Sequence, residues 1–181
     1  TYSTPHLNKL AKAGMYFEHC YSTPICTPSR VQIMTGLYNF RNYLKFGQLA
    51  ITQTTFANHL RGSGYRTGIC GKWQLGGNSD TVQQFGFDTH CLWHLDGRDS
   101  RYWNPRISRD GQLLDGLEDA FGPDIMTDFA CDFLSADSSK PFFLYYPMTL
   151  PHWPFVPTPD SKPGGTRELD GKYDGRQGGE E

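Results

Sequence analysis

The 181-residue sequence has little of what marks several large classes of protein. Its 17 Lys and Arg against 19 Asp and Glu give a net charge of −2, so it lacks the basic surplus that binds nucleic acid. No apolar run approaches the length that spans a membrane. Its five cysteines include no Cys-x-x-Cys pair, which argues against a structural zinc site. We therefore expect neither nucleic acid nor a membrane among its partners.

The sequence also opens without a segment typical of a signal peptide, so its residues alone predict no compartment. With 37% hydrophobic and 14% aromatic residues, the composition is that of a globular protein of one-domain size. Beyond residue 156 the composition changes to Gly, Pro and charge. We expect one domain over residues 1–156 and a loop or linker over residues 157–181.

Residues 26–36 predict a helix with a reactive group at its start. Pro28 suits a first helical turn, and Gly36 is a common helix terminator. Its apolar face would consist of Val31, Ile33 and Met34. Cys26 would then lie just before the helix N-terminus, where backbone N–H groups favour negative charge. Arg30, about one turn later, would bring a guanidinium to the same point, so this arrangement could hold a tetrahedral oxyanion.

Alternation of periodic segments and turn residues predicts an α/β fold. The expected helices cover residues 4–14, with Leu7 and Leu10 buried, and residues 54–60 and 123–134. The expected strands cover residues 15–21, a short stretch before Lys72, and residues 142–146, the last covered on both faces.

Two polar residues follow expected strands. Lys72 lies in a glycine-flanked loop after one strand, and His152 lies just beyond the apolar run 142–146. Open α/β sheets bind ligands at the carboxyl ends of their strands, so both are candidate ligand contacts.

The segment 91–109 is rich in aromatic and basic side chains: Trp93, His94, Arg98, Arg101, Tyr102, Trp103 and Arg106. Such a mixture can bind an anionic or sugar-like ligand by stacking and charge. It can equally form a loop packed on the protein's own surface. The sequence leaves both possibilities open.

Three motifs together carry a resemblance to a known family. Cys-Thr-Pro-Ser-Arg at 26–30 is followed by an apolar stretch and Thr-Gly. Gly-Tyr-Arg-Thr at 64–67 precedes Gly-Lys-Trp-Gln-Leu-Gly at 71–76, with Gly-Phe-Asp further on. Lys-Pro-Phe-Phe precedes Pro-His-Trp-Pro-Phe at 151–155. In these three motifs the chain resembles the type I, formylglycine-dependent sulfatases, and it looks arylsulfatase-like. The first motif does not fit the loop of a cysteine phosphatase, because those loops keep five residues between Cys and Arg, whereas here there are three.

The resemblance implies a role for each candidate residue. Cys26 would be oxidised to formylglycine by the formylglycine-generating enzyme, and Arg30 would stabilise charge beside it. Lys72 would bind the sulfate of a sulfate ester together with the formylglycine. His152 would contact the sulfate or protonate the leaving alcohol. Gln74 stands where the family commonly has histidine, so it could orient the hydrated aldehyde but not shuttle a proton.

The family resemblance also implies an alkaline-phosphatase-like layered fold, with a mainly parallel sheet between helices. It implies calcium, bound by paired aspartates on an earlier strand and by an Asp-Asn pair on a later one. No Asp-Asn dipeptide occurs here, and Cys26, as formylglycine, would be the chain's single calcium ligand. We therefore expect an N-terminal-domain fragment that is incomplete at both ends and inactive by itself. A periplasmic or secreted location is what the family implies.

Other functions remain open from the sequence. Formylglycine-dependent phosphodiesterases and phosphonate hydrolases use similar helices, and a non-catalytic remnant that binds anions or glycans would fit the missing carboxylates. The sequence does not name the esterified alcohol, because specificity resides in loops that share no short motif.

Overall fold

The structure is a computed structural model that describes residues 4–97, 99–136 and 139–160. Arg98 and residues 161–181, most of the expected linker, lie outside the described residues. The helices are α1 (Pro5–Ala13), α2 (Cys26–Thr35), the 3-10 helix η1 (Asn39–Arg41), α3 (Phe56–Gly62), α4 (Ser79–Gln84) and α5 (Gly122–Ser135). The strands are β1 (Arg66–Lys72), β2 (Thr89–Trp93), β3 (Ile107–Arg109), β4 (Gln112–Leu113) and β5 (Phe142–Tyr145).

The strands form one sheet in the order β4-β3-β2-β1-β5. The central strand β1 pairs in parallel with β2 and β5, whereas β2–β3 and β3–β4 are antiparallel. The β1–β2 register places Lys72 opposite Trp93, so the carboxyl ends of these two strands meet at one edge of the sheet. The prediction of an α/β fold with a mainly parallel sheet is confirmed.

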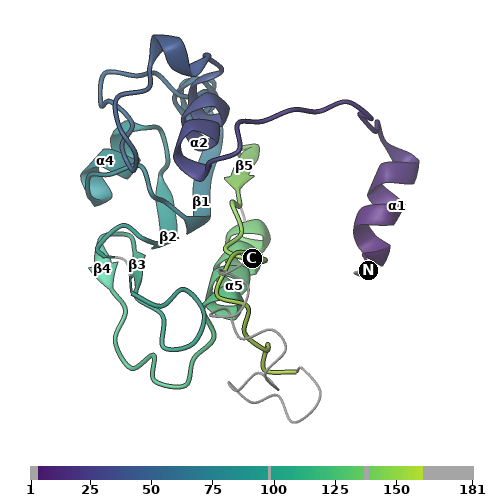
Figure 1. Ribbon diagram of the computed structural model, residues 1–181, viewed down its shortest axis with the longest axis vertical. Helices are drawn as coiled ribbons and strands as arrows, with labels where there is room; N and C mark the ends of the chain where they lie inside the picture. The colour runs from purple at the N-terminus through teal and green to yellow at the C-terminus, as the bar shows by residue number, and fades with distance from the viewer. Residues whose placement is uncertain (1–3, 98, 137–138, 161–181) are drawn as a thin grey trace.

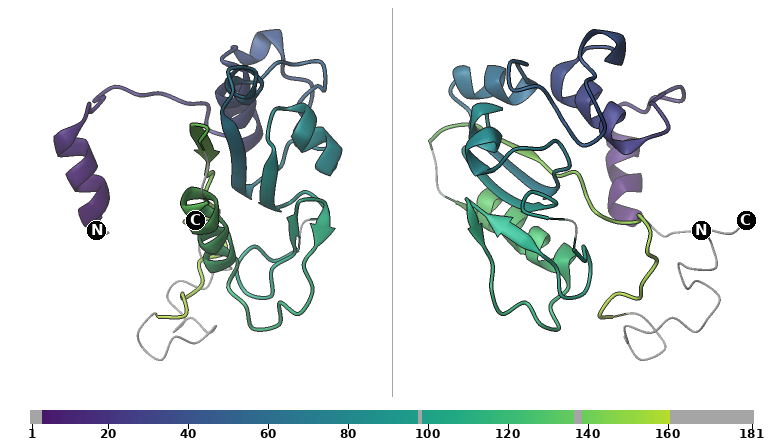
Figure 2. Two further views of the ribbon diagram at one scale, coloured as in Figure 1. Left: turned by 180° about the vertical axis from the view of Figure 1, so that it is seen from behind. Right: turned by 60° about the vertical axis from the view of Figure 1, so that its left-hand side comes forward.

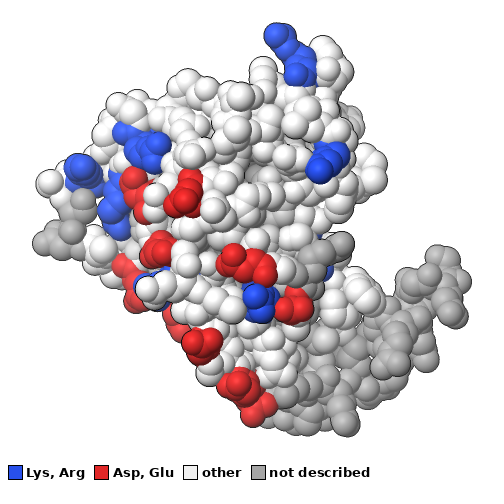
Figure 3. Space-filling view, turned by 90° about the vertical axis from the view of Figure 1, so that its left-hand side faces the viewer, with Lys and Arg blue, Asp and Glu red and all other residues white. Residues whose placement is uncertain are grey.

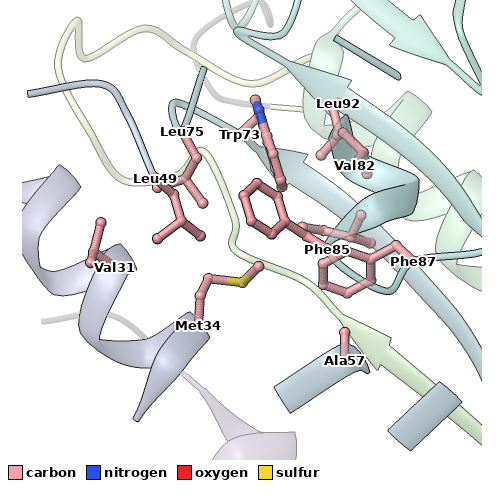
Figure 4. Packing of buried hydrophobic residues seen from close by; sticks show 11 residues of the cluster. Val31, Met34, Leu49, Ala57, Trp73, Leu75, Val82, Phe85, Phe87 and Leu92 are labelled. Carbon is pink, nitrogen blue, oxygen red and sulfur yellow. The ribbon is translucent and has the colours of Figure 1, made fainter. Parts of the chain in front are cut away.

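Helices cover both faces of the sheet (Figure 1). On one face, Val31 and Met34 of α2 pack against residues that follow β1, as Figure 4 shows. This cluster comprises Val31, Met34, Leu49, Ala57, Ile69, Trp73, Leu75, Val82, Phe85, Phe87 and Leu92. On the other face, Met126 and Phe129 of α5 pack against β1 and β2. Burial of each such side chain contributes about 2 kcal/mol to the free energy of unfolding. This packing fixes α2 and β1 relative to each other.

Helix α2 begins at Cys26 and ends as the sequence predicts. Gly36 adopts a left-handed conformation (φ 68°), and its N–H donates to the carbonyl of Gln32. Cys26 is the first helical residue, with Ile25 as N-cap, rather than the residue before the helix. Ile33, expected on the apolar face, is 53% exposed, whereas Val31 and Met34 are buried.

The N-terminal region differs from the prediction. Helix α1 forms as expected, but Leu7 and Leu10 are about two-thirds exposed, and α1 buries none of its residues. Residues 15–21 form no strand; they run as irregular chain that carries α1 away from the sheet (Figures 1 and 2). The amphipathic pattern predicted the helix correctly, but it does not say what the apolar stripe packs against.

Strand β5 is also less covered than predicted. It lies at an edge of the sheet as described, Phe142 is 48% exposed, and the remaining residues of β5 are half-buried. An apolar run predicts a strand with neighbours on both sides and helices on both faces. Among the described residues, the sheet has no further strand beyond β5. The helix expected over 54–60 begins two residues later, because Thr55 serves as N-cap in a capping box with Asn58.

The surface carries no single sign of charge on the face shown in Figure 3, where basic and acidic side chains are interspersed. No helix among the described residues is both long and apolar enough to cross a membrane.

We expect Gly71→Ala to disrupt the end of β1. Gly71 has φ 114°, and a Cβ there would overlap the Pro147 carbonyl oxygen, which also accepts the Lys72 N–H at 2.9 Å. The strain alone predicts a loss of at least about 2 kcal/mol in the free energy of unfolding, measured by denaturant titration. Gly62→Ala is the control, because Gly62 has an ordinary φ and open space around its Cβ position. Equal stabilities of the two variants would contradict this account.

We expect His90 to make the fold sensitive to acid. Its side chain is buried on β2, and burial lowers its pKa although the carboxylates of Asp110 and Asp96 act in the opposite direction. The folded state therefore holds the neutral ring, while the unfolded chain takes up a proton near pH 6.5. The free energy of unfolding should fall as pH falls below about 6.5. His90→Leu should flatten that slope in thermal unfolding between pH 7 and pH 5.5; an unchanged slope would contradict the assignment.

Candidate active site

The site forms where β1 ends beside the first turn of α2. Lys72 is the last residue of β1, and its ammonium group lies within electrostatic range of the side chain of Cys26, the first residue of α2. Burial lowers the pKa of Lys72, and the nearby Cys26 side chain opposes that shift. Lys72 is only 7% exposed, so its charge is directed into the site rather than into solvent.

Arg30 connects α2 to the same strand end. Its Nε donates to the carbonyl of Trp73 at 2.8 Å, and its Nη2 donates to the carbonyl of Lys72. Arg30 is 7% exposed; burial lowers its pKa, and guanidinium stays protonated in proteins nonetheless. Two donors of the planar fork thus bond to the carbonyls of two successive residues, Lys72 and Trp73. Arg30 holds Lys72 in place and adds positive charge near Cys26.

Gln74 occupies a strained position two residues beyond Lys72. It has φ 52°, an uncommon conformation for a residue with a side chain, and it is 3% exposed. Its Oε1 is buried, and no hydrogen bond joins it to any residue of the described chain. A buried amide oxygen of this kind requires a partner, and a bound ligand is one candidate.

His152 reaches the site from the loop after β5. Its Nδ1 lies 2.7 Å from the carbonyl of Trp153; since a carbonyl can only accept, Nδ1 carries the proton and Nε2 is left for a ligand. Burial lowers the pKa of His152, and the charges of Arg101 and Lys72 lower it further. His152 therefore lies within electrostatic range of Lys72, although its side chain is exposed.

Tyr102 anchors the loop that carries His152. Its hydroxyl lies 3.0 Å from the carbonyl of Thr149 and 2.5 Å from the carbonyl of His152. The ring is 2% exposed and stacks on Phe121, with centroids 6.1 Å apart. A cavity of about 510 Å³ lies next to Tyr102 and His152 and is lined mainly by apolar residues of 148–156.

The segment 91–109 both packs on the protein and contributes to the site. Trp93 and Tyr102 are buried, so neither ring can stack on a sugar. Arg101, by contrast, is partly exposed, and its Cζ lies 4.2 Å from the centroid of the Trp93 ring. The sequence pattern drew attention to this segment but did not single out Arg101. Recognition of Thr89–Trp93 as a strand beside β1 would have placed Trp93 next to Lys72.

Calcium, which the family resemblance implies, does not fit the described residues by themselves. Among residues 4–97, 99–136 and 139–160, no group of three or more His, Cys, Asp or Glu could hold a metal ion. The charged side chains that converge here are cations, and calcium prefers six to eight oxygen ligands.

The sulfatase family model matches residues 1–176 of this chain. The chain belongs to the sulfatase family. Rat steryl-sulfatase is 35% identical over 47% of this chain and 17% of its own length. Human arylsulfatase D is 36% identical over 43% of this chain and 16% of its own length. Mouse arylsulfatase G is 28% identical over 88% of this chain and 38% of its own length. The sulfatase chain thus spans well under half the length of these curated relatives.

Solved structures agree with the family and the fold. The structure of BT4656 in complex with its substrate D-glucosamine-2-N,6-O-disulfate superposes with a TM-score of 0.74 at 30% identity, over 86% of this chain and 31% of that one. The structure of Ps i-CgsB superposes with a TM-score of 0.74 at 23% identity, over 86% of this chain and 41% of that one. At this identity it supports the fold alone. The predicted sulfatase-type, alkaline-phosphatase-like layered fold is confirmed.

Of the five site residues predicted from the sulfatase motifs, the structure brings Cys26, Arg30 and Lys72 together directly. His152 lies within electrostatic range of Lys72, and the Tyr102 hydroxyl holds its backbone carbonyl. Gln74 is buried nearby in the chain, but no hydrogen bond links its Oε1 to the others.

We expect Tyr102→Phe to release the His152 loop of this sulfatase. Loss of the hydroxyl removes the donor from the His152 carbonyl and one of two donors from the Thr149 carbonyl, which also accepts the His152 N–H. This should cost about 1 to 2 kcal/mol in the free energy of unfolding. Amide hydrogen exchange over residues 149–155 should become faster. Tyr146→Phe is the control, because that hydroxyl contacts Thr127 and Pro123 of α5 instead. Unchanged exchange in Tyr102→Phe would show that other contacts hold the loop.

Proposed function

We propose that this chain carries part of the active site of a sulfuric ester hydrolase, in which formylglycine derived from Cys26 attacks the sulfur of a sulfate ester. The observation that carries the proposal is that the Lys72 ammonium lies within electrostatic range of the Cys26 side chain, at a strand end held by Arg30. Formylglycine, once formed by the converting enzyme, supplies a hydrated aldehyde whose hydroxyl is the nucleophile.

The side chains around Cys26 have separable tasks in this proposal. Lys72 binds the sulfate oxygens and keeps them beside the nucleophile, because its charge is buried and fixed. Arg30 holds the strand end and stabilises negative charge that develops near Cys26. Gln74 orients the hydrated aldehyde through its unsatisfied amide oxygen.

His152 protonates the departing alcohol or binds the sulfate. Burial and then the nearby cations lower its pKa, which favours the neutral ring in the absence of substrate. An incoming sulfate places negative charge between His152, Lys72 and Arg101, which favours the protonated ring. The proton thus becomes available when the substrate is bound, and Nε2 is the atom that would deliver it.

The substrate is proposed as a sulfate ester of a sugar, aryl or steroid alcohol. The relatives are named steryl-sulfatase and arylsulfatase, and the BT4656 structure holds a doubly sulfated glucosamine. Calcium would need ligands from outside the described residues, and we derive no step through it.

The proposal predicts that Cys26→Ala abolishes sulfate-ester hydrolysis. In the full-length protein, kcat for 4-nitrophenyl sulfate should fall at least about a thousandfold, because the nucleophile is lost. Cys131→Ala should retain the parental rate, since Cys131 is an exposed cysteine on α5. Mass spectrometry of the parental Cys26 peptide should show that the sulfur has been lost.

Three outcomes would contradict the proposal. Parental turnover by Cys26→Ala would exclude Cys26 as the nucleophile. An unmodified thiol in protein from its own host would favour a binding remnant instead. A phosphate diester of 4-nitrophenol, hydrolysed faster than the sulfate, would reassign the chain to the phosphodiesterase branch.

A further inference from the structure

We propose that Thr27, the residue after Cys26, is a positioning residue that holds Gln74 at the reaction centre through the chain segment 47–49. This inference rests on the proposed function, because the placement of Gln74 matters to the reaction only if residue 26 carries the nucleophile. It adds to that function a residue that acts on the reaction through another one.

The side chain of Thr27 is directed into the protein at the start of α2. Thr27 is fully buried, whereas Cys26 beside it is half-buried, and its Oγ1 accepts the N–H of Gly47 at 3.0 Å. Asn39 Nδ2 donates to the carbonyl of Pro28 at 3.0 Å, which ties the same stretch of chain to α2 a second time. The chain that leaves α2 therefore folds back onto the first turn of the helix.

Residues 47–49 also contact the turn that follows β1. The Leu49 N–H donates to the Leu75 carbonyl at 2.9 Å, and both side chains belong to the buried cluster shown in Figure 4. A Cβ placed on Gly76 would lie 3.2 Å from the carbonyl oxygen of Gly47, so these two backbone segments are in close contact. Residues 47–49 thus connect the start of α2 to the turn that follows β1.

Gln74 depends on this support because its backbone conformation is strained. Gln74 has φ 52°, and the next turn residue but one, Gly76, has φ 76°. Trp73 Nε1 donates to the Gly76 carbonyl at 2.7 Å and closes the turn around Gln74. A strained residue keeps its conformation only where its surroundings impose it. No hydrogen bond joins Gln74 Oε1 to another residue of the described chain, so the backbone of the turn directs this oxygen.

Two separate ties therefore connect α2 to the chain after β1. Arg30 bonds the carbonyls of Lys72 and Trp73, and it fixes the group that is proposed to bind sulfate. Thr27, through residues 47–49, fixes the turn that carries Gln74. Loss of the Thr27 hydroxyl should displace Gln74 and leave Lys72 in place. The reaction step should then suffer while substrate binding is kept.

Thr27→Val tests this link in the full-length protein, because valine keeps the shape of threonine and removes the acceptor. With 4-nitrophenyl sulfate, kcat should fall about tenfold or more, since a small displacement of a positioned group has a large effect on rate. KM should change less than about twofold, because Lys72 and Arg30 are untouched. Thr27→Ser should restore the parental kcat. Mass spectrometry of the residue-26 peptide should show equal conversion in all variants.

Thr35→Val is the matched control at the other end of α2. The Thr35 Oγ1 donates to the Val31 carbonyl at 2.6 Å and accepts from Asn42 Nδ2 at 2.8 Å. Both substitutions remove hydroxyl hydrogen bonds from one helix, but kcat should fall only in Thr27→Val. In a Gln74→Ala background, Thr27→Val should cause little further loss of kcat, because Thr27 acts through Gln74.

Amide hydrogen exchange tests the same link without turnover. Exchange over residues 47–49 and 74–77 should become faster in Thr27→Val and stay at the parental rate in Thr35→Val. An exchange response of this kind in a parental protein without turnover would support the link from Thr27 to Gln74 while refuting the hydrolase.

Three results would overturn the proposal. These are equal losses of kcat in Thr27→Val and Thr35→Val, a loss in Thr27→Val that adds in full to that of Gln74→Ala, and unchanged exchange over residues 74–77 in Thr27→Val. If Thr27→Val does not fold, Thr27→Ala takes its place in each measurement, because the smaller side chain also lacks the hydroxyl and introduces no new contact.

Discussion

The attachment of α2 to the end of β1 is the constraint on which the rest of the site depends. Arg30 reaches across to the carbonyls of Lys72 and Trp73, so the helix that begins at Cys26 cannot shift relative to the strand that ends at Lys72. Val31 and Met34 on the buried face of α2 fix the same pair of elements from the core side. The proximity of Lys72 to Cys26 follows from this geometry and from the close approach to the Pro147 carbonyl that Gly71 permits at the end of β1.

Around this fixed centre, the other groups are arranged by depth. Arg30 and Lys72 are buried, Arg101 rests on Trp93 at intermediate depth, and His152 is exposed on a loop anchored by Tyr102. Positive charge therefore extends from the half-buried Cys26 towards solvent. Such a gradient attracts an anion and orients it, because the deepest cations are the least hydrated. The proposed chemistry is a consequence of this distribution of charge.

The sequence predicted the local features better than the long-range ones. The Cys26 helix, the Lys72 strand and α5 follow from caps, periodicity and glycine placement, which act over a few residues. Burial of Leu7 and Leu10 and full coverage of β5 were wrong, because an apolar stripe specifies no packing partner. The placement of Trp93 and Arg101 beside Lys72 could not be predicted, since it depends on the register of β1 with β2, and that pairing joins residues far apart in the chain.

A crystal structure of the full-length Cys26→Ala protein with a bound sulfate ester tests the central claim most directly. The account predicts that the sulfate lies beside residue 26, with its oxygens within hydrogen-bond distance of Lys72 Nζ and with His152 Nε2 directed at the ester oxygen. A sulfate bound elsewhere, with Lys72 and His152 turned away from it, would contradict the account.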